Sequence, residues 1–319
     1  MSTIHSVAVI GAGMAGAIAA RHLAGAGVNV LVLDKGRTVG GRMSTRRLSG
    51  DLSFDHGAQY FTARDPRFVA AVAAWVADGV AEPWPAEPGW FVGTPTMRAP
   101  AEALTRDLDV LTRCTVTQVH RDSEGWRLTV AGGEPVAGGR RFDALLVTAP
   151  APQAALLLAT AGVSLPELDR VRYAPCWALM LAHDGPSPLA QTFWRGSDPA
   201  APVAWLAQNN TKPGRPARPV ALVAHASPDW SRRHLEDEAP HVEALLRAEV
   251  AGHVGGALQA TAAVAHRWRY ALVETAIGEP CLWRPEIGLG FAGDGCLGGR
   301  VEAAYLSGLA LAERVLSDA

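Results

Sequence analysis

The chain has little lysine, few cysteines and no long hydrophobic run. Of its 29 lysine and arginine residues only Lys35 and Lys212 are lysines, and the net charge at neutral pH is −2. A chain without a basic excess has no electrostatic reason to bind nucleic acid or an anionic membrane surface. No apolar run approaches the roughly 18 residues of a membrane span, and the first residues lack the pattern of a signal peptide. We therefore expect a cytoplasmic protein whose partners are small molecules.

The four cysteines give no sign of a metal site or a disulfide framework. They form no CxxC pair and have no histidines at a matching spacing. Reduced, buried thiols are the expected state of such cysteines, and we predict no metal. The cysteines are Cys114, Cys176, Cys281 and Cys296.

The N-terminal residues carry a dinucleotide-binding pattern. Residues 7–10 predict a buried parallel strand, residues 14–24 a helix and residues 28–33 a second strand. In the G-x-G-x-x-G turn that follows the first strand, glycines permit a tight turn and the close approach of a pyrophosphate. The helix N-terminus supplies partial positive charge for that phosphate. The turn consists of Gly11, Ala12, Gly13, Met14, Ala15 and Gly16.

Asp34 ends the second predicted strand, where a carboxylate can accept hydrogen bonds from ribose hydroxyls. An acid at this position disfavours a 2′-phosphate, although Lys35 and Arg37 nearby weaken that inference. The motif and Asp34 together predict a dinucleotide site but leave NAD and FAD open.

Two further glycine-rich segments favour FAD. Gly40-Gly41-Arg42 follows Asp34, and its arginine can clamp a diphosphate. Near the C-terminus, Gly293-Asp294-Gly295 follows a predicted strand, and a helix begins at Val301. A helix N-terminus aimed at a reduced flavin stabilises its negative charge, which an NAD dehydrogenase does not need. The sequence therefore predicts one FAD, bound non-covalently.

The remaining segments are less regular. The segment EPWPAEPGW has no periodicity and is typical of an insertion, and the loop GGEPVAGG predicts a hairpin between the strands on either side of it. Three later strand-like runs suit an antiparallel sheet that covers a site. The other predicted helices are 68–77, 101–108, 241–252 and 301–316, and the other predicted strands are 114–120, 125–130, 144–148, 176–182, 203–208, 220–226 and 289–292.

Several of these segments resemble a known family. The opening VAVIGAGMAG…VLDKGRTVGGRMSTRR resembles the flavin-dependent amine oxidase superfamily. The stretch FDHGAQYFT at 54–62, the strand end Thr148-Ala149-Pro150, the stretch HRWRY at 266–270 and the terminal GDG…VEAA are similar to its renalase-like bacterial branch. The resemblance is strong at both ends of the chain and weak from about 156 to 260.

The resemblance implies an α/β fold with a Rossmann-type, glutathione-reductase-like FAD-binding domain and a second, mainly antiparallel substrate domain. We expect the first domain at residues 1–64, 98–160 and 275–319, and the second at 65–97 and 161–274. The resemblance also implies an activity, the oxidation of misformed dihydronicotinamide isomers of NAD(P)H to NAD(P)+. Dioxygen then accepts the electrons and yields hydrogen peroxide.

The resemblance places FAD along the first strand–helix–strand unit. It implies pyrophosphate at Gly13 to Ala15, ribose on Asp34, the diphosphate near Arg42, and the flavin ring beside Gly57 to Gln59. It further implies adenine against Val116, and ribityl and pyrimidine between Asp294, Arg300 and Val301. The full set of expected cofactor residues is Gly11, Ala12, Gly13, Met14, Ala15, Gly16, Asp34, Lys35, Gly41, Arg42, Met43, His56, Gly57, Ala58, Gln59, Val116, Gly293, Asp294, Arg300 and Val301.

The residues argue against amine oxidation within the superfamily. Its amine oxidases typically hold a lysine near the flavin, whereas Lys35 lies in the ribose loop and Lys212 in a proline-rich loop expected at the surface. The aromatic residue that they tend to carry before the last helix is replaced by Gly298-Gly299-Arg300. A dihydropyridine becomes aromatic when it loses hydride, so its oxidation requires no general base.

Candidate substrate-contacting residues are Gln59, Tyr60, Phe61 and Trp268, with Arg267 or Arg269 for a substrate phosphate. For each of the aromatic residues, simple core packing is the alternative. Two other functions stay open: another oxidase or desaturase of the same superfamily, acting on amines or polyenes, and a non-catalytic flavin- or nucleotide-binding module.

Overall fold

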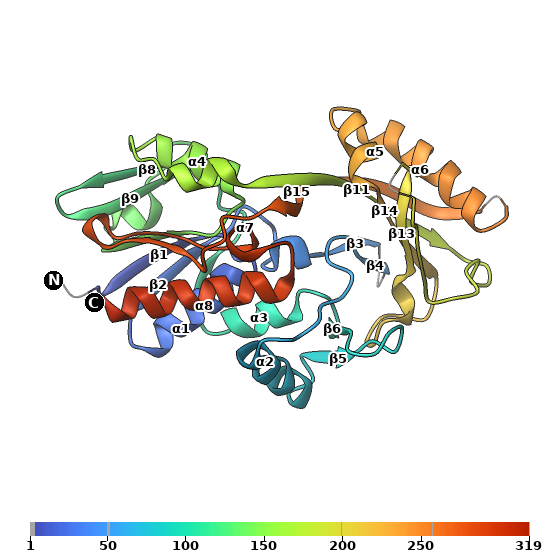
Figure 1. Cartoon of the computed structure of the whole chain (residues 1–319), viewed down its shortest axis with the longest axis horizontal. Helices are drawn as coiled ribbons and strands as arrows, with labels where there is room; N and C mark the ends of the chain where they lie inside the picture. Colours follow the sequence, from blue (N-terminus) through green and yellow to red (C-terminus); the bar gives the residue numbers. More distant parts are fainter. Residues whose placement is uncertain (1–3, 50–51, 199, 257, 319) are drawn as a thin grey trace.

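The computed structural model describes residues 4–49, 52–198, 200–256 and 258–318. Two sheets organise the chain, and the long strands of the second sheet reach back toward the first (Figure 1). The first sheet has six strands in the order β16-β17-β10-β1-β2-β7. Its strands are β1 (Ser6–Ile10), β2 (Asn29–Leu33), β7 (Asp109–Leu111), β10 (Ala144–Val147), β16 (Leu282–Arg284) and β17 (Leu289–Phe291).

The six-stranded sheet is parallel except for β16, and it is buried on both faces. Along β1, Val7 and Val9 pack against the helices of one face, whereas Ala8 and Ile10 pack on the other. Burial on both faces explains the unbroken apolar runs that predicted the strands β1, β2, β10 and β17, whereas the edge strand β7 is partly exposed. The first face is covered by α1 (Met14–Gly25), α3 (Ala99–Thr105) and α8 (Val301–Ser317), and the second by α4 (Ala151–Ala159) with the hairpin of β8 (Val116–Asp122) and β9 (Gly125–Val130).

The predicted hairpin across GGEPVAGG is wrong. Strand β9 pairs with β8, while β10 lies between β1 and β17 in the six-stranded sheet. All four residues of β10 are buried, as in a central parallel strand, whereas β9 alternates between buried and less buried positions. The loop itself contains a short 3-10 turn, Val136–Gly139, and an isolated bridge between Pro135 and Thr129.

The second sheet is antiparallel, with five strands in the order β12-β13-β14-β11-β15. One face packs against α5 (Pro228–Arg233) and α6 (Ala239–His253), which lie above the sheet in Figure 1. The opposite face packs on Phe54 of a hairpin that sequence reasoning did not predict, formed by β3 (Thr45–Ser49) and β4 (Leu52–Asp55). The five strands are β11 (Arg172–His183), β12 (Phe193–Arg195), β13 (Val203–Gln208), β14 (Val220–Ala226) and β15 (Ala260–Thr275).

The remaining elements are the helices α2 and α7 and a small hairpin of β5 and β6. Helix α2 (Pro66–Ala77) is capped by Asp65, whose side chain accepts from the Arg67 N–H. The segment expected to be irregular forms most of the loop of a small hairpin, β5 (Ala81–Pro83) and β6 (Phe91–Gly93). The short helix α7 (Asp294–Leu297) precedes α8. The expected α/β fold class, with a Rossmann-type sheet and a separate antiparallel sheet, is confirmed, while the exact domain boundaries stay a prediction.

Candidate functional site

The glycine-rich turn leaves an open cradle at the N-terminus of α1. A Cβ on Gly11 would lie 2.6 Å from the Thr148 Oγ1, and one on Gly16 would lie 1.9 Å from the Gly11 carbonyl oxygen. A Cβ on Gly13 would meet nothing within 4 Å. Gly11 and Gly16 are therefore required by packing, whereas Gly13 opens the backbone to a ligand. No side chain caps the helix at Gly13, so the helix N-terminus is available for phosphate.

Asp34 is oriented by the backbone around it. Its Oδ2 accepts from the Ala12 N–H at 2.7 Å and its Oδ1 from the Gly36 N–H at 2.6 Å. Each carboxylate oxygen has a further lone pair, so both can still accept from ribose hydroxyls. The Cys114 N–H donates to the Asp34 carbonyl oxygen at 2.9 Å, which places the chain leading to Val116 beside this loop.

Arg42 and Asp294 join the two ends of the chain. The Arg42 Nη1 lies 2.7 Å from the Asp294 Oδ2 and the Nη2 lies 2.6 Å from the Oδ1, a bidentate pair. Burial would lower the pKa of Arg42, but the Asp294 carboxylate outweighs it and raises the pKa above its ordinary value. Gly41 adjoins the cradle, because its Cβ would lie 3.3 Å from the Gly13 Cα. The expected bidentate partner of Arg42 was a diphosphate; in the structure it is Asp294.

The segment Gly57 to Gln59, which is expected beside the flavin ring, contacts the backbone of Arg42. The Ala58 N–H donates to the Arg42 carbonyl oxygen at 2.8 Å, and a Cβ on Gly57 would lie 2.0 Å from that oxygen. Gln59 is buried; its Nε2 donates to the Gly57 carbonyl oxygen at 3.1 Å, and its Oε1 accepts from the Lys212 Nζ at 3.2 Å. The Gln59 amide is thus fixed in one orientation.

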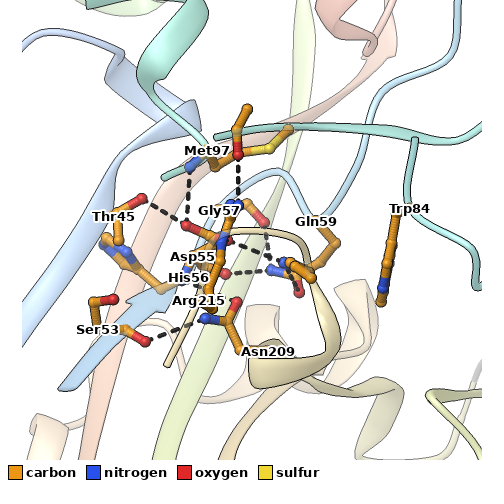
Figure 2. Close-up of polar contacts among 12 residues, drawn as sticks. Thr45, Ser53, Asp55, His56, Gly57, Gln59, Trp84, Met97, Asn209 and Arg215 are labelled. Carbon is orange, nitrogen blue, oxygen red and sulfur yellow. Dashed lines mark hydrogen bonds and ion pairs between the residues drawn. The ribbon is translucent and has the colours of Figure 1, made fainter. Parts of the chain in front are cut away.

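Behind Gln59 lies a buried ion network centred on Asp55. Figure 2 shows Thr45, Met97 and Arg215 converging on its carboxylate. The Asp55 Oδ2 lies 2.7 Å from the Arg215 Nη2 and 3.3 Å from the Lys212 Nζ. Burial favours the protonated acid, but the charges of Lys212 and Arg215 outweigh it and hold the Asp55 pKa well below its ordinary value.

The expectation that Lys212 lies in a surface loop is wrong. Its side chain is 0% exposed, and its Nζ sits over the Trp84 ring at 5.4 Å from the centroid. The Asn209 Nδ2 donates to the Ser53 carbonyl oxygen at 3.1 Å, which ties the loop to the edge of β4. Composition pointed to solvent because it could not show that Asp55, more than 150 positions earlier, lies opposite this loop.

Two histidines, His225 and His266, and Trp268 surround His56. The His56 ring stacks on the Trp268 ring at 5.0 Å and meets the His266 ring edge-on at 4.8 Å. The His56 carbonyl oxygen accepts from the Trp268 Nε1 at 2.9 Å and lies 3.2 Å from the His225 Nε2. These contacts bring the predicted site residues His56 and Trp268 together with His225 and His266.

Burial keeps the three imidazoles neutral. It lowers the pKa of His56 to about 3, and that of His225 and of His266 to about 4. The His56 Nδ1 is buried and has no protein partner among the described residues. A buried polar atom without a partner at this position is the kind of group that a bound ligand satisfies.

The other expected residues divide between this region and the core. Tyr60 stacks on Trp90, with ring centroids 3.6 Å apart and an interplanar angle of 6°. Phe61 is 3% exposed and packs against aromatic residues of α2, the core alternative for this residue. Met43 is buried in the same cluster. Arg300 precedes α8 and pairs with Glu302 at 3.4 Å.

Arg267 is not brought to the site. It lies on the face of β15 opposite Trp268, because side chains alternate along a strand. There it donates to the Leu235 carbonyl oxygen and pairs with Glu236 at 3.3 Å. Arg269 shares this face and the same partner, at 2.7 Å. Neither arginine lies where a substrate phosphate beside Trp268 would need it.

These features define a class, an α/β protein with a dinucleotide-binding Rossmann-type sheet. The cradle at Gly13, the lone pairs of Asp34, the N-terminus of α1 and the orphaned His56 Nδ1 fit FAD. Residues 9–75 match the NAD(P)-binding Rossmann-like domain, and residues 86–316 match flavin containing amine oxidoreductase. The chain belongs to the flavin-containing amine oxidoreductase family; it is an oxidoreductase whose cofactor is FAD.

A solved structure shows the same fold. The chain is similar to a protein from Exiguobacterium sp. 255-15 described as "Putative protoporphyrinogen oxidase", with a TM-score of 0.79 and 14% sequence identity. The match covers 100% of both chains. At this identity the likeness concerns the fold alone.

Three further findings bear on the predicted chemistry. Within the described ranges, no helix has both the length and the apolar character to cross a membrane. The same residues hold no cluster of three metal-ligating side chains. Burial raises the pKa of the Cys296 thiol to about 12, so this thiol near the α7 end stays protonated and is a weak nucleophile at neutral pH.

Proposed function

We propose that the protein oxidises dihydronicotinamide isomers of NAD(P)H to NAD(P)+, as a renalase-like member of its family. FAD would accept the hydride, and dioxygen would accept the electrons and yield hydrogen peroxide. One observation carries the proposal. The residues of the antiparallel sheet that contact His56 and Gln59 are two neutral histidines, His225 and His266, and one tryptophan, Trp268. Among the described residues, no free carboxylate contacts His56 or Gln59 from this sheet.

A site lined by neutral aromatic side chains suits a substrate that loses a hydride without losing a proton. Loss of hydride makes a dihydropyridine aromatic, so the protein must hold the ring and exclude water rather than abstract a proton. Trp268 and His266 offer aromatic faces, and the Gln59 amide is locked by Lys212. We propose that Gln59, Tyr60 and Trp268 line the substrate space, and that Gly57 to Gln59 lie beside the flavin ring.

We propose that the expected cofactor residues act as the family resemblance implies. Gly13 to Ala15 would hold the pyrophosphate, and Asp34 the ribose. Arg42 and Asp294 would act as one unit at the diphosphate and ribityl chain, because they are bonded to each other. Support comes from the cradle at Gly13 and from the position of Gly41 against it.

Amine oxidation is the second candidate, and one observation favours it. Lys212 is not at the surface but buried within hydrogen-bonding distance of Gln59, so the argument from a missing lysine no longer holds. Against this candidate, the Lys212 ammonium is already bound by Asp55 and Gln59. The absence of an aromatic residue at Gly298-Gly299-Arg300 also still counts against it.

A substrate panel separates the candidates. FAD-loaded protein in air is given borohydride-treated NAD+, which contains the dihydronicotinamide isomers, or a set of primary and secondary amines. We expect NAD+ and hydrogen peroxide in equal amounts from the isomers and no peroxide from the amines. Peroxide from amines alone would replace the proposal with amine oxidation. Yellow protein that turns over neither class would indicate a different substrate or a non-catalytic flavin module.

A further inference from the structure

One row of side chains crosses all five strands of the antiparallel sheet. Direct cross-strand pairs place Arg195 beside Trp205, Trp205 beside His225, His225 beside Ala178, and Ala178 beside His266. Directly paired residues of antiparallel strands project from the same face of the sheet. The five residues therefore form a continuous row that runs from a cation, through an indole, to two imidazoles.

This row faces the segment that carries Gln59. At one end, the His266 ring contacts His56 and the His225 Nε2 lies 3.4 Å from the Gln59 Nε2. At the other end, the Arg195 Nη2 donates to the Tyr60 hydroxyl at 3.0 Å. The Arg195 end of the row therefore lies beside Tyr60, the residue that follows Gln59.

Arg195 is a cation held on aromatic faces. Its guanidinium carbon lies 5.6 Å from the Trp90 ring centroid and 5.4 Å from that of Trp205. Within the part of the chain that the structure describes, no carboxylate lies at ion-pair distance from it. Stacking orients a guanidinium while leaving its edge free to bind an anion through two N–H groups.

A second observation at the same end points to a ligand. Trp205 is 7% exposed, and its indole Nε1 is buried without a hydrogen-bond partner among the described residues. An indole N–H in this state costs free energy unless an acceptor reaches it. The Arg195 guanidinium, which has no carboxylate partner among the described residues, therefore lies against the Trp205 indole, whose N–H has no acceptor there.

We infer that Arg195 binds the phosphate of the substrate, with Trp205 and the stacked Tyr60 and Trp90 forming the platform beneath it. The inference rests on the proposed function, because phosphate is the only anionic group of a dihydronicotinamide nucleotide. It also assigns the role that sequence reasoning gave to Arg267 or Arg269, both of which are neutralised by Glu236 on the other face. The preferred substrate class is then the phosphorylated isomers rather than the nucleoside.

The test compares two substrates that differ only in phosphate. The substrates are the isomers of dihydronicotinamide mononucleotide and the matching isomers of the riboside. Each is mixed with FAD-loaded wild type, Arg195→Gln and Arg195→Lys, and stopped-flow absorbance measures the reduction of the flavin. For Arg195→Gln we expect the KM for the mononucleotide to rise roughly ten- to hundredfold, the loss of a charge-assisted hydrogen bond. The maximal reduction rate and the KM for the riboside should stay within about twofold, and Arg195→Lys should recover part of the loss.

Arg247→Gln is the matched control, since Arg247 is an exposed residue of α6 paired with Glu243 across the sheet from this row. It should leave both KM values unchanged. An Arg195→Gln protein with unchanged KM for the mononucleotide, or with equal rises for both substrates, would overturn the inference while leaving the proposed function intact. Wild-type flavin that is reduced neither by these two substrates nor by the dihydronicotinamide isomers of NAD(P)H would instead overturn the proposed function, and this inference with it.

Discussion

Two ion clusters join segments that are far apart in the chain, and they differ in their surroundings. The Arg42–Asp294 pair connects residues 252 positions apart, with side chains 29% and 10% exposed beside the glycine cradle. The Asp55 cluster connects the β4 hairpin to the loop of Lys212 and Arg215, with side chains at most 2% exposed. In the first, one cation meets one anion; in the second, two cations share one carboxylate.

The difference in exposure between the two clusters predicts different roles, cofactor binding for the Arg42–Asp294 pair and stability of the fold for the Asp55 cluster. The Arg42 side chain is partly exposed, so water can compensate its charge when the Asp294 carboxylate is removed, and the pair contributes little to stability. A buried cluster behaves differently, since removal of one member leaves uncompensated charge in the interior. We therefore expect the first cluster to matter for the cofactor and the second to hold the antiparallel sheet on the hairpin.

The largest effect is expected for Asp55→Asn. This change leaves Lys212 and Arg215 buried without their carboxylate, and we expect a loss of about 3–5 kcal/mol in the free energy of unfolding. Urea unfolding of the FAD-loaded protein measures it. Asp229→Asn, which removes an exposed partner of Arg232, is the control and should change stability by less than about 1 kcal/mol. Equal losses in the two variants would erase the distinction between the clusters.

Acidification should lower the stability of the folded protein, because three buried histidines contact one another or Gln59 at the site. His56, His225 and His266 stay neutral in the folded protein down to about pH 3–4, whereas the unfolded chain binds their protons below about pH 6.5. The unfolded state then holds more protons, so stability falls as the pH drops from 6.5 toward 4, by up to about 1.4 kcal/mol per pH unit for each histidine. Thermal unfolding at a series of pH values measures the slope.

A His225→Gln variant should flatten that slope, because one of the three proton-linked groups is gone. His241, exposed on α6 with its Nε2 3.8 Å from Asp237, supplies the comparison variant His241→Gln, which should leave the slope unchanged. A slope that is the same in both variants and in wild type would show that these buried imidazoles do not set the acid sensitivity.

Asp34→Ala should lower the affinity for FAD roughly ten- to hundredfold without unfolding the protein, because a charge-assisted acceptor for ribose is lost. The carboxylate also holds the Ala12 and Gly36 N–H groups, so the loop loses order as well. Flavin absorbance relative to protein after purification is the readout, with circular dichroism to verify the fold. Full retention of flavin would contradict the placement of ribose at Asp34.

The smallest change in stability is expected for Asp294→Asn. Asparagine keeps the shape and part of the hydrogen bonding to Arg42, whose side chain is partly exposed to water. The free energy of unfolding should therefore change by about 1 kcal/mol or less. Flavin retention should nevertheless fall several-fold. A variant that loses as much stability as Asp55→Asn, yet keeps its flavin, would assign this pair to folding rather than binding.

The predictable part of the molecule is the part specified locally. The first strand, glycine turn and helix lie within 25 consecutive residues, and Gly11, Gly13 and Gly16 follow from the geometry of one turn. The C-terminal segment around Asp294 was predictable for the same reason. Boundaries were less reliable; β8 begins two residues later than the pattern indicated, at Val116.

The unpredictable part is specified by pairing between distant segments. Nothing near Lys212 in the sequence reveals Asp55, and the row from Arg195 to His266 exists only because five strands align in one register. Arg267 shows the reverse case. Its position next to Trp268 in the sequence suggested a shared site, but alternation along β15 places it on the opposite face.

The most direct test of the account is an anaerobic titration of the FAD-loaded protein with purified dihydronicotinamide isomers. The account predicts that the yellow absorbance of the flavin disappears at one equivalent, that NAD(P)+ forms in the same amount, and that admitted air restores the colour. Flavin that keeps its colour in excess isomer but loses it in a simple amine would contradict the account.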